Sequence, residues 1–311
     1  MLRIILGSIM SAGIWWGLYA EAEEITVVPG KSIQKALDKL SKTGGIVTLK
    51  AGVHKVSSSL LIHSNIILQG ELARDRTKVV IVPGKEGMNQ PLITNNKPIH
   101  NVIIRNLTIR GDLRDEEKRY PAEYLRNKNI PMRTGLLGIF FNAGGDSYET
   151  AQNQNITIDN VEVINCSMGI HIKGSRDVTL SRLNLHDNGM IKKYFHNMYL
   201  RRVFNVFVKD SIFYDSPTGC GINISQSGDV HIENCEARDN FWRGIRIYGE
   251  KGWIVKGIHV AGNRCLNNGD AGFLLCNIEG GEVLDNIAQY NRAGNLRQAN
   301  LRGVDMKKNK F

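Results

Sequence analysis

Residues 155–174 read NITIDNVEVINCSMGIHIKG, and this pattern decides the fold because it returns along the chain. Related stretches begin at residues 177, 205 and 229, which are separated from 155 and from one another by 22, 28 and 24 residues. Each copy starts with Asn or Asp, alternates apolar and polar residues through two short strands, turns at Asn or Asp, and continues into a strand such as Gly-Ile-x-Ile. Fainter copies lie at 101–112 and near Ile258.

A unit of this length cannot bury its own apolar side chains, so neighbouring units must cover one another. Three short strands per unit, with no long helix between units, predict coils of a single-stranded parallel β-helix. The recurring turn residues are expected to form a ladder that satisfies backbone groups at one corner of the coil. Its predicted members are Asn165, Asp187, Asp215, Asp239, Asn267 and Asn291.

The segment before the repeats predicts a cap for one end of this solenoid. Ser32 can begin a helix that presents Ile33, Ala36, Leu37 and Leu40 on one side and ends before Gly44-Gly45. Such a helix would shield the open edges of the first strands. Strands are expected at 46–49 and 65–70, where the coils begin.

The stretch SIQKALDKLSKTGGIVTLKAGVHKV (32–56), followed by the Asn-initiated repeats, resembles the pectate-lyase-like superfamily of right-handed parallel β-helix proteins. The resemblance covers roughly residues 26–300. It implies an all-β solenoid in which each coil has three strands, with an N-terminal capping helix. The superfamily includes lyases, hydrolases, epimerases and phage tail proteins, so the resemblance leaves the activity open.

Stacking the Gly-Ile-x-Ile strands in register predicts which side chains face outward together, on coils about 4.8 Å apart. One outward column contains Phe140, His171, Tyr199, Asn223, Arg246 and Leu274. The next contains Asn142, Lys173, Arg201, Ser225, Tyr248 and Cys276. Neither column has a carboxylate, which favours a functional groove over a solvated face. Long loops at 112–134 and 142–154 are expected to frame it, and Lys192, Lys193 and His196 from the inserted segment 189–196 to add a basic rim.

Residues 1–22 are typical of a secretory signal, with Arg3, an apolar run and Ala20-Glu21-Ala22. We therefore expect a secreted or periplasmic protein whose mature domain is 23–311. The net charge of +10 favours an acidic partner. Export and the lack of a long aromatic basic track disfavour nucleic acid, and no membrane contact is expected after cleavage. Five cysteines without a CxxC pair indicate buried packing residues.

The predicted groove suits β-elimination on a uronate polymer, for which a cation must neutralise the C5 carboxylate and a base and an acid must move protons. We predict Tyr199, His171, Arg246 and Lys173 as catalytic residues. His171 has an ordinary pKa of about 6.5 and would titrate near neutrality, and nearby cations favour the phenolate of Tyr199. Binding of the polymer is assigned to Arg201, Asn223, Tyr248, His196 and Lys193.

Tyr, His and Arg or Lys in one groove are similar to the sites of calcium-independent alginate lyases and related C5-epimerases. That similarity implies alginate as the first substrate, with pectate behind it, and neither metal nor cofactor. Epimerisation shares the proton abstraction and stays open. A glycoside hydrolase is also open, although Asp215 fits the turn ladder and Cys220 stands where polygalacturonases have a histidine. The remaining alternative is a non-catalytic carbohydrate-binding or adhesion β-helix.

Overall fold

The period of the sequence is present in the strand pairing of the computed structural model. Parallel pairing joins Ile156 to Val178, Val178 to Val206, and Val206 to Val230. These four residues hold the same position in the four repeats, so the predicted register is confirmed. The structure describes residues 22–71, 75–113, 117, 133–190, 193–250 and 252–311. The predicted signal up to residue 21, most of the loop 112–134 and Lys192 lie outside the described residues.

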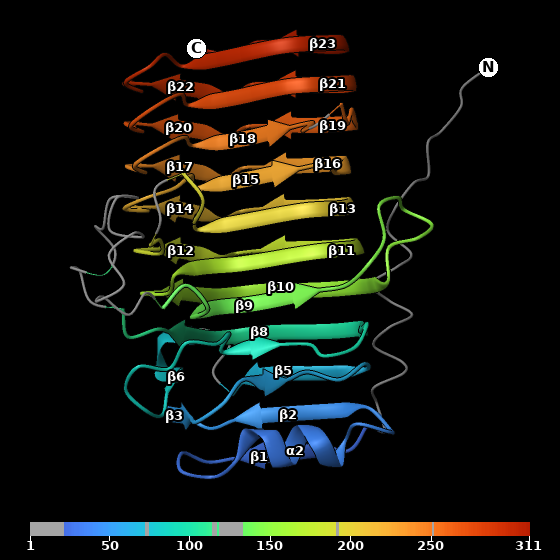
Figure 1. The fold of residues 1–311 in the computed structure, drawn as a ribbon, viewed down its shortest axis with the longest axis vertical. Coiled ribbons are helices and arrows are strands. Elements are labelled where there is room, and N and C mark those ends of the chain that lie inside the picture. The colour runs from blue at the N-terminus through green and yellow to red at the C-terminus, as the bar shows by residue number, and fades with distance from the viewer. Residues whose placement is uncertain (1–21, 72–74, 114–116, 118–132, 191–192, 251) are drawn as a thin grey trace.

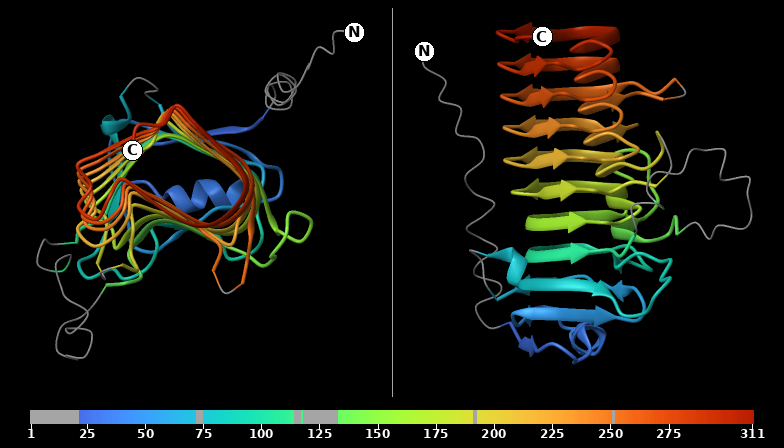
Figure 2. Two further views of the ribbon diagram at one scale, coloured as in Figure 1. Left: turned by 90° about the horizontal axis from the view of Figure 1, so that it is seen from above. Right: turned by 90° about the vertical axis from the view of Figure 1, so that its left-hand side faces the viewer.

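The chain forms a parallel β-helix whose coils lie on top of one another, with three strand-bearing faces around the axis (Figures 1 and 2). The first face contains β4 (Leu60–Leu61), β7 (Ile93–Thr94), β9 (Leu137–Asn142), β15 (Ile222–Ser225) and β18 (Ile245–Tyr248). Four long strands bend from the first face into the second, namely β11 (Met168–Ser181), β13 (Met198–Lys209), β21 (Phe273–Leu284) and β23 (Leu296–Lys307).

The second face also contains β1 (Glu24–Val27), β2 (Gly45–Leu49), β5 (Ile66–Gly70), β16 (Gly228–Glu233) and β19 (Val255–Ala261). Two strands continue from the second face into the third, β8 (His100–Arg110) and β10 (Asn153–Ile164). The third face contains β3 (Gly52–Val56), β6 (Val79–Pro83), β12 (Asn184–His186), β14 (Ile212–Tyr214), β17 (Glu236–Arg238), β20 (Arg264–Leu266) and β22 (Ile287–Gln289). A short 3₁₀ helix, η1, spans Arg76–Lys78.

The hydrophobic core runs through the inside of the coils because every second strand residue is apolar and points inward. On the first face, Ile170, Leu200, Ile224 and Ile247 are fully buried, one on each of four successive strands. The residues next to them along each strand face outward. Each such aliphatic side chain contributes about 1.5–3 kcal/mol by burial. This alternation holds the outward column in a fixed position, which is what a site on a strand requires.

The predicted capping helix is confirmed as α2 (Ile33–Lys39), which closes one end of the solenoid (Figure 2). Ser32 is its N-cap, and the Ser32 hydroxyl accepts a hydrogen bond of 3.2 Å from the Lys35 N–H. Leu37 and Leu40 are fully buried against the first coils. In the described residues, no helix has the length and apolar character to span a membrane.

The corner after the third face contains the expected ladder of left-handed residues, with one correction. Asn165, Asp187, Asp215, Asp239 and Asn267 have φ between 48° and 56°, a conformation that Asn and Asp tolerate. In the last of these coils the left-handed residue is Tyr290, with φ 58°, and the prediction of Asn291 is wrong by one position. The side chain of Asn291 instead points inward, where it accepts a hydrogen bond of 2.9 Å from Asn268 Nδ2.

Four of the cysteines, Cys166, Cys220, Cys235 and Cys265, are buried and form no disulfide among the described residues, as the sequence predicted. Cys276 is also a free thiol but is only half-buried, because it belongs to an outward column.

Candidate functional site

The two outward columns have the register that the sequence predicts. His171 pairs with Phe140 and Tyr199, Tyr199 with Asn223, and Asn223 with Arg246. The second column follows the same register, with Lys173 beside Arg201, Ser225 beside Arg201, and Tyr248 beside Ser225. The polar and cationic side chains of four coils therefore lie together on the first face.

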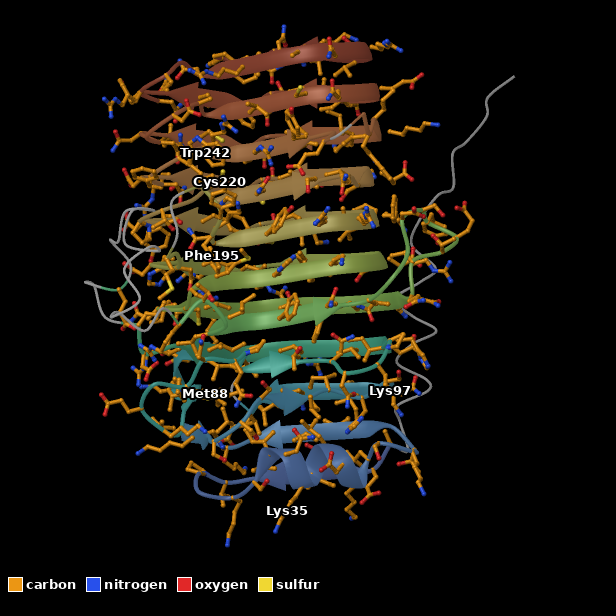
Figure 3. The ribbon with its side chains drawn as sticks, in the orientation of Figure 1. Lys35, Met88, Lys97, Phe195, Cys220 and Trp242 are labelled. Atoms are coloured by element: carbon orange, nitrogen blue, oxygen red, sulfur yellow. The ribbon has the colours of Figure 1, made fainter. Side chains whose placement is uncertain are left out.

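A pocket of about 420 Å³ opens on this face at the coils of β13, β15 and β18. Figure 3 marks its side of the solenoid, where Phe195, Cys220 and Trp242 lie over successive coils. We call this the His196 pocket, and it is lined by Lys193, Tyr194, His196, Tyr199, Asn223, Trp242, Arg246 and Glu250. Five predicted site residues line it: Lys193, His196, Tyr199, Asn223 and Arg246. The other four, His171, Lys173, Arg201 and Tyr248, lie outside its lining.

His196 is not part of an exposed basic rim, which corrects the expectation from the sequence. Its ring is 2% exposed and lies beside Tyr199 and Trp242, with ring centroids 5.7 and 6.3 Å away. Burial, reinforced by the nearby Arg246, lowers the pKa of His196 to about 3. The imidazole is therefore neutral at any physiological pH.

The hydrogen bonds around His196 fix which ring nitrogen carries the proton. The backbone N–H of Cys220 donates to His196 Nδ1 at 3.0 Å. A neutral imidazole has one acceptor nitrogen and one N–H, so Nε2 must carry the hydrogen. That Nε2 lies 2.8 Å from Nδ2 of Asn223, which also carries hydrogens. Two donors therefore face each other.

Turning the Asn223 amide does not remove this conflict. In the present orientation Asn223 Oδ1 accepts from Arg246 Nη1 at 2.7 Å. The opposite orientation would satisfy His196 but bring the amide NH₂ against the guanidinium, which has no acceptor. Among the described residues, either orientation of the Asn223 amide therefore leaves one N–H of this buried trio facing another N–H.

Arg246 is held at the pocket by Asn223, Glu250 and Tyr248. Its Nη2 donates to Glu250 Oε1 at 3.2 Å, and its guanidinium carbon lies 4.4 Å from the centroid of the Tyr248 ring. Its side chain is 11% exposed, and within the described residues its Nε has no hydrogen-bond partner. The cation is thus positioned by the pair with Glu250 and by stacking on Tyr248.

Tyr199 has its hydroxyl 3.0 Å from the Ser225 hydroxyl, which belongs to the neighbouring column. Arg201 Nε donates to Gln226 Oε1 at 3.0 Å, on the adjacent part of the same face. These contacts hold the Tyr199 hydroxyl beside Ser225 and the Arg201 guanidinium beside Gln226.

His171 supports Tyr199 from the coil below. Its ring lies between Phe140 and Tyr199, with centroids 5.0 and 4.9 Å away. Burial, with smaller contributions from Lys173 and Arg201, lowers the pKa of His171 to about 4. The expected titration near neutrality is therefore wrong, since covering the ring disfavours its charged form.

Sequence reasoning missed Trp242, Glu250 and Tyr194. All three come from the segments that join strands, where the alternation that predicts outward columns does not apply. Glu250 adds a carboxylate that the two outward columns lack, because it reaches Arg246 from the turn after β18. In the described residues, no three His, Cys, Asp or Glu side chains converge as metal ligands would.

The sequence model described as the right handed beta helix region matches residues 148–311. A search of curated proteins found no match. Among solved structures, the A-module of a mannuronan C-5 epimerase from Azotobacter vinelandii is similar at a TM-score of 0.51, with 16% identity over 90% of this chain and 91% of that chain. The Dettilon tailspike protein reaches a TM-score of 0.58, with 12% identity over 91% of this chain and 62% of that one. DFA-IIIase from Arthrobacter chlorophenolicus reaches 0.55, with 12% identity over 82% and 62%. Identities this low establish the shared fold and no shared activity.

Proposed function

We propose that this chain, which belongs to the family of right-handed β-helix proteins, is a polysaccharide lyase that binds an acidic polysaccharide in the His196 pocket and cleaves it by β-elimination. The first substrate is alginate, with pectate next. The fold alone does not choose this chemistry. The observation that carries the proposal is the surplus N–H group shared by His196, Asn223 and Arg246.

A sugar carboxylate supplies the acceptor that this trio lacks. With the carboxylate bound to Arg246, the Asn223 amide can turn so that its oxygen accepts from His196 Nε2 and its NH₂ donates to the ligand. The N–H groups of His196 and Asn223 then each have an acceptor, and the carboxylate receives a charge-assisted hydrogen bond from the guanidinium. A neutral hydroxyl would accept as well, but it would not balance the charge of Arg246.

Neutralising the C5 carboxylate makes the adjacent C5 proton acidic. In our proposal Tyr199 is the base that takes that proton. The C5–H electron pair forms the C4=C5 double bond, the C4–O4 bond breaks, and the departing O4 takes the proton back from the Tyr199 hydroxyl. His196 is a positioning residue, since its single N–H orients Asn223, and half-buried, neutral His171 supports the Tyr199 ring.

A uronate C5-epimerase is a second candidate, favoured by the similarity to the mannuronan C-5 epimerase module over nine tenths of both chains. It shares the first proton abstraction, after which a proton returns to the opposite face of C5 and the C4–O4 bond stays intact.

The test is incubation of the protein with alginate, pectate and a neutral polysaccharide, while the ultraviolet absorbance of the new conjugated double bond is followed. We expect absorbance with a uronate polymer, and a loss of about 10²–10⁴-fold in Tyr199→Phe. Tyr214→Phe is the matched control, because Tyr214 lies on the third face and stacks on His186. Reducing ends without absorbance would contradict the lyase and indicate a hydrolase. Solvent hydrogen exchange at C5 without cleavage would indicate the epimerase.

The proposal also places the protein outside the cytoplasm, in the periplasm or the medium, where such polymers are met. Fractionation of the producing cell, with a cytoplasmic marker enzyme as control, tests this. Recovery with the cytoplasmic marker would contradict it.

A further inference from the structure

We propose that a second pocket, next to the His196 pocket and across Trp242 from it, is a subsite for a further acidic sugar of the same polymer. The polymer would then lie along the solenoid axis, from the coil of β13 toward the coil of β23. This inference rests on the proposed function in one respect, that the ligand is a uronate chain.

The second pocket has a volume of about 580 Å³ and shares Lys193 and Trp242 with the His196 pocket. Its remaining lining comes from three successive coils, in the segments that precede β18, β21 and β23 and in the start of β23 itself. Coils follow one another at about 4.8 Å. A polysaccharide that leaves the His196 pocket past Trp242 would therefore enter the second pocket directly.

The charges of the second pocket suit an anionic ligand. Asp270 is shared by two cations, since its Oδ2 accepts from Arg243 Nε at 2.8 Å and its Oδ1 lies 3.0 Å from Arg297 Nη1. Lys193 and Arg292 also line this pocket, and both are exposed and form no ion pair with any described residue. The other acid of the lining, Asp239, is paired with Arg238 at 2.8 Å. Four cations thus line this pocket, and Asp270 is the lining carboxylate that is not paired with a cation outside the lining.

Trp242 connects the two pockets physically. The Arg243 guanidinium carbon lies 3.9 Å from the Trp242 ring centroid, while Arg246 and Lys193 Nζ each lie 5.9 Å from it. Cation–π contacts hold Arg243 on the indole. Arg246 then serves one pocket and Arg243 with its neighbours serves the other. Two separated cationic positions match a ligand that carries one carboxylate on each sugar, which an isolated sugar cannot provide.

The experiment measures binding of mannuronate oligosaccharides, from disaccharide to octasaccharide, by isothermal titration calorimetry in the Tyr199→Phe background, so that cleavage does not interfere. The test variant carries Arg292→Gln and Arg297→Gln. The matched control carries Arg302→Gln and Lys308→Gln, two exposed cations at the same end of the chain that line neither pocket. Circular dichroism confirms that each variant is folded.

We expect the test variant to weaken octasaccharide binding about tenfold or more and to leave disaccharide binding unchanged, while the control changes neither. An equal loss at every length, or a loss that the control reproduces, would overturn the subsite. Length-dependent loss without any cleavage by the wild type would support the subsite while the lyase proposal fails. Cleavage by the wild type with no length-dependent loss would reject the subsite alone.

Discussion

Asn223 and Asn240 are both buried asparagines, with exposures of 4% and 1%, but their surroundings differ in one respect. Asn240 uses all of its side-chain hydrogen-bonding capacity. Its Oδ1 accepts from Asn197 Nδ2 and from the Ser216 N–H, and its Nδ2 donates to Phe213 O and to the oxygen of Asn268. Asn223 has one satisfied oxygen and an NH₂ that faces another donor.

The difference separates a structural residue from a residue prepared for a ligand. Asn240 belongs to a ladder that continues through Asn268 to Asn291, and each member satisfies the next. Buried polar groups in folded proteins are normally paired in this way. An exception that opens into a pocket marks the place where a bound molecule completes the network. Burial alone would have classed the two asparagines together.

The largest effect should follow from Asn240→Asp. The carboxylate would keep the two incoming hydrogen bonds but lose both outgoing ones, and it would face the oxygens of Phe213 and Asn268. A buried carboxylate without a cation beside it costs several times as much as one ordinary hydrogen bond. We therefore expect a loss of about 3 kcal/mol in the free energy of unfolding. Denaturant unfolding measures this. Unchanged stability would mean that the ladder of Asn240, Asn268 and Asn291 does not stabilise the fold.

The same substitution at Asn223 should have the opposite sign. In Asn223→Asp both carboxylate oxygens are acceptors, so Arg246 and His196 Nε2–H would each find a partner. We expect a gain of about 1–2 kcal/mol in stability together with loss of polyuronate binding, because the new carboxylate pairs with Arg246 and repels the carboxylate of the ligand. Thermal unfolding and calorimetry on one preparation measure both. A less stable Asn223→Asp protein would contradict the surplus donor.

Much of this site follows from the sequence, because the strand alternation and the repeat length of a solenoid are visible in the sequence itself. The pairing of His171, Tyr199, Asn223 and Arg246 follows from placing equivalent strand residues on successive coils. The turn ladder follows equally from the preference of Asn and Asp for left-handed backbone. Its one error, Asn291 in place of Tyr290, is a shift by a single residue at the last predicted rung.

The remainder could not be predicted, for a physical reason. Trp242 and Glu250 lie in connecting segments, whose paths no repeat fixes. His196 is the last residue of the inserted segment 189–196, and its burial depends on how that segment returns to the coil. The position of its proton depends on a backbone N–H from the next coil, that of Cys220. A histidine that sequence alone places on a basic rim is therefore a neutral donor in the structure.

The smallest effect concerns the proton of His196. Its pKa is about 3 in the folded protein and about 6.5 in an unfolded chain, so the unfolded state binds more protons below neutrality and stability falls as the pH is lowered. Between pH 8 and pH 6 this group should cost the wild type about 0.8 kcal/mol. His196→Gln removes that contribution but keeps the other histidines, so the two unfolding curves should diverge by this amount. Nitrogen-15 spectra of the wild-type ring should show the hydrogen on Nε2 from pH 5 to pH 8. A proton on Nδ1, or a ring that titrates near 6.5, would remove the distinction between Asn223 and Asn240, because Nε2 would then be free to accept from Asn223.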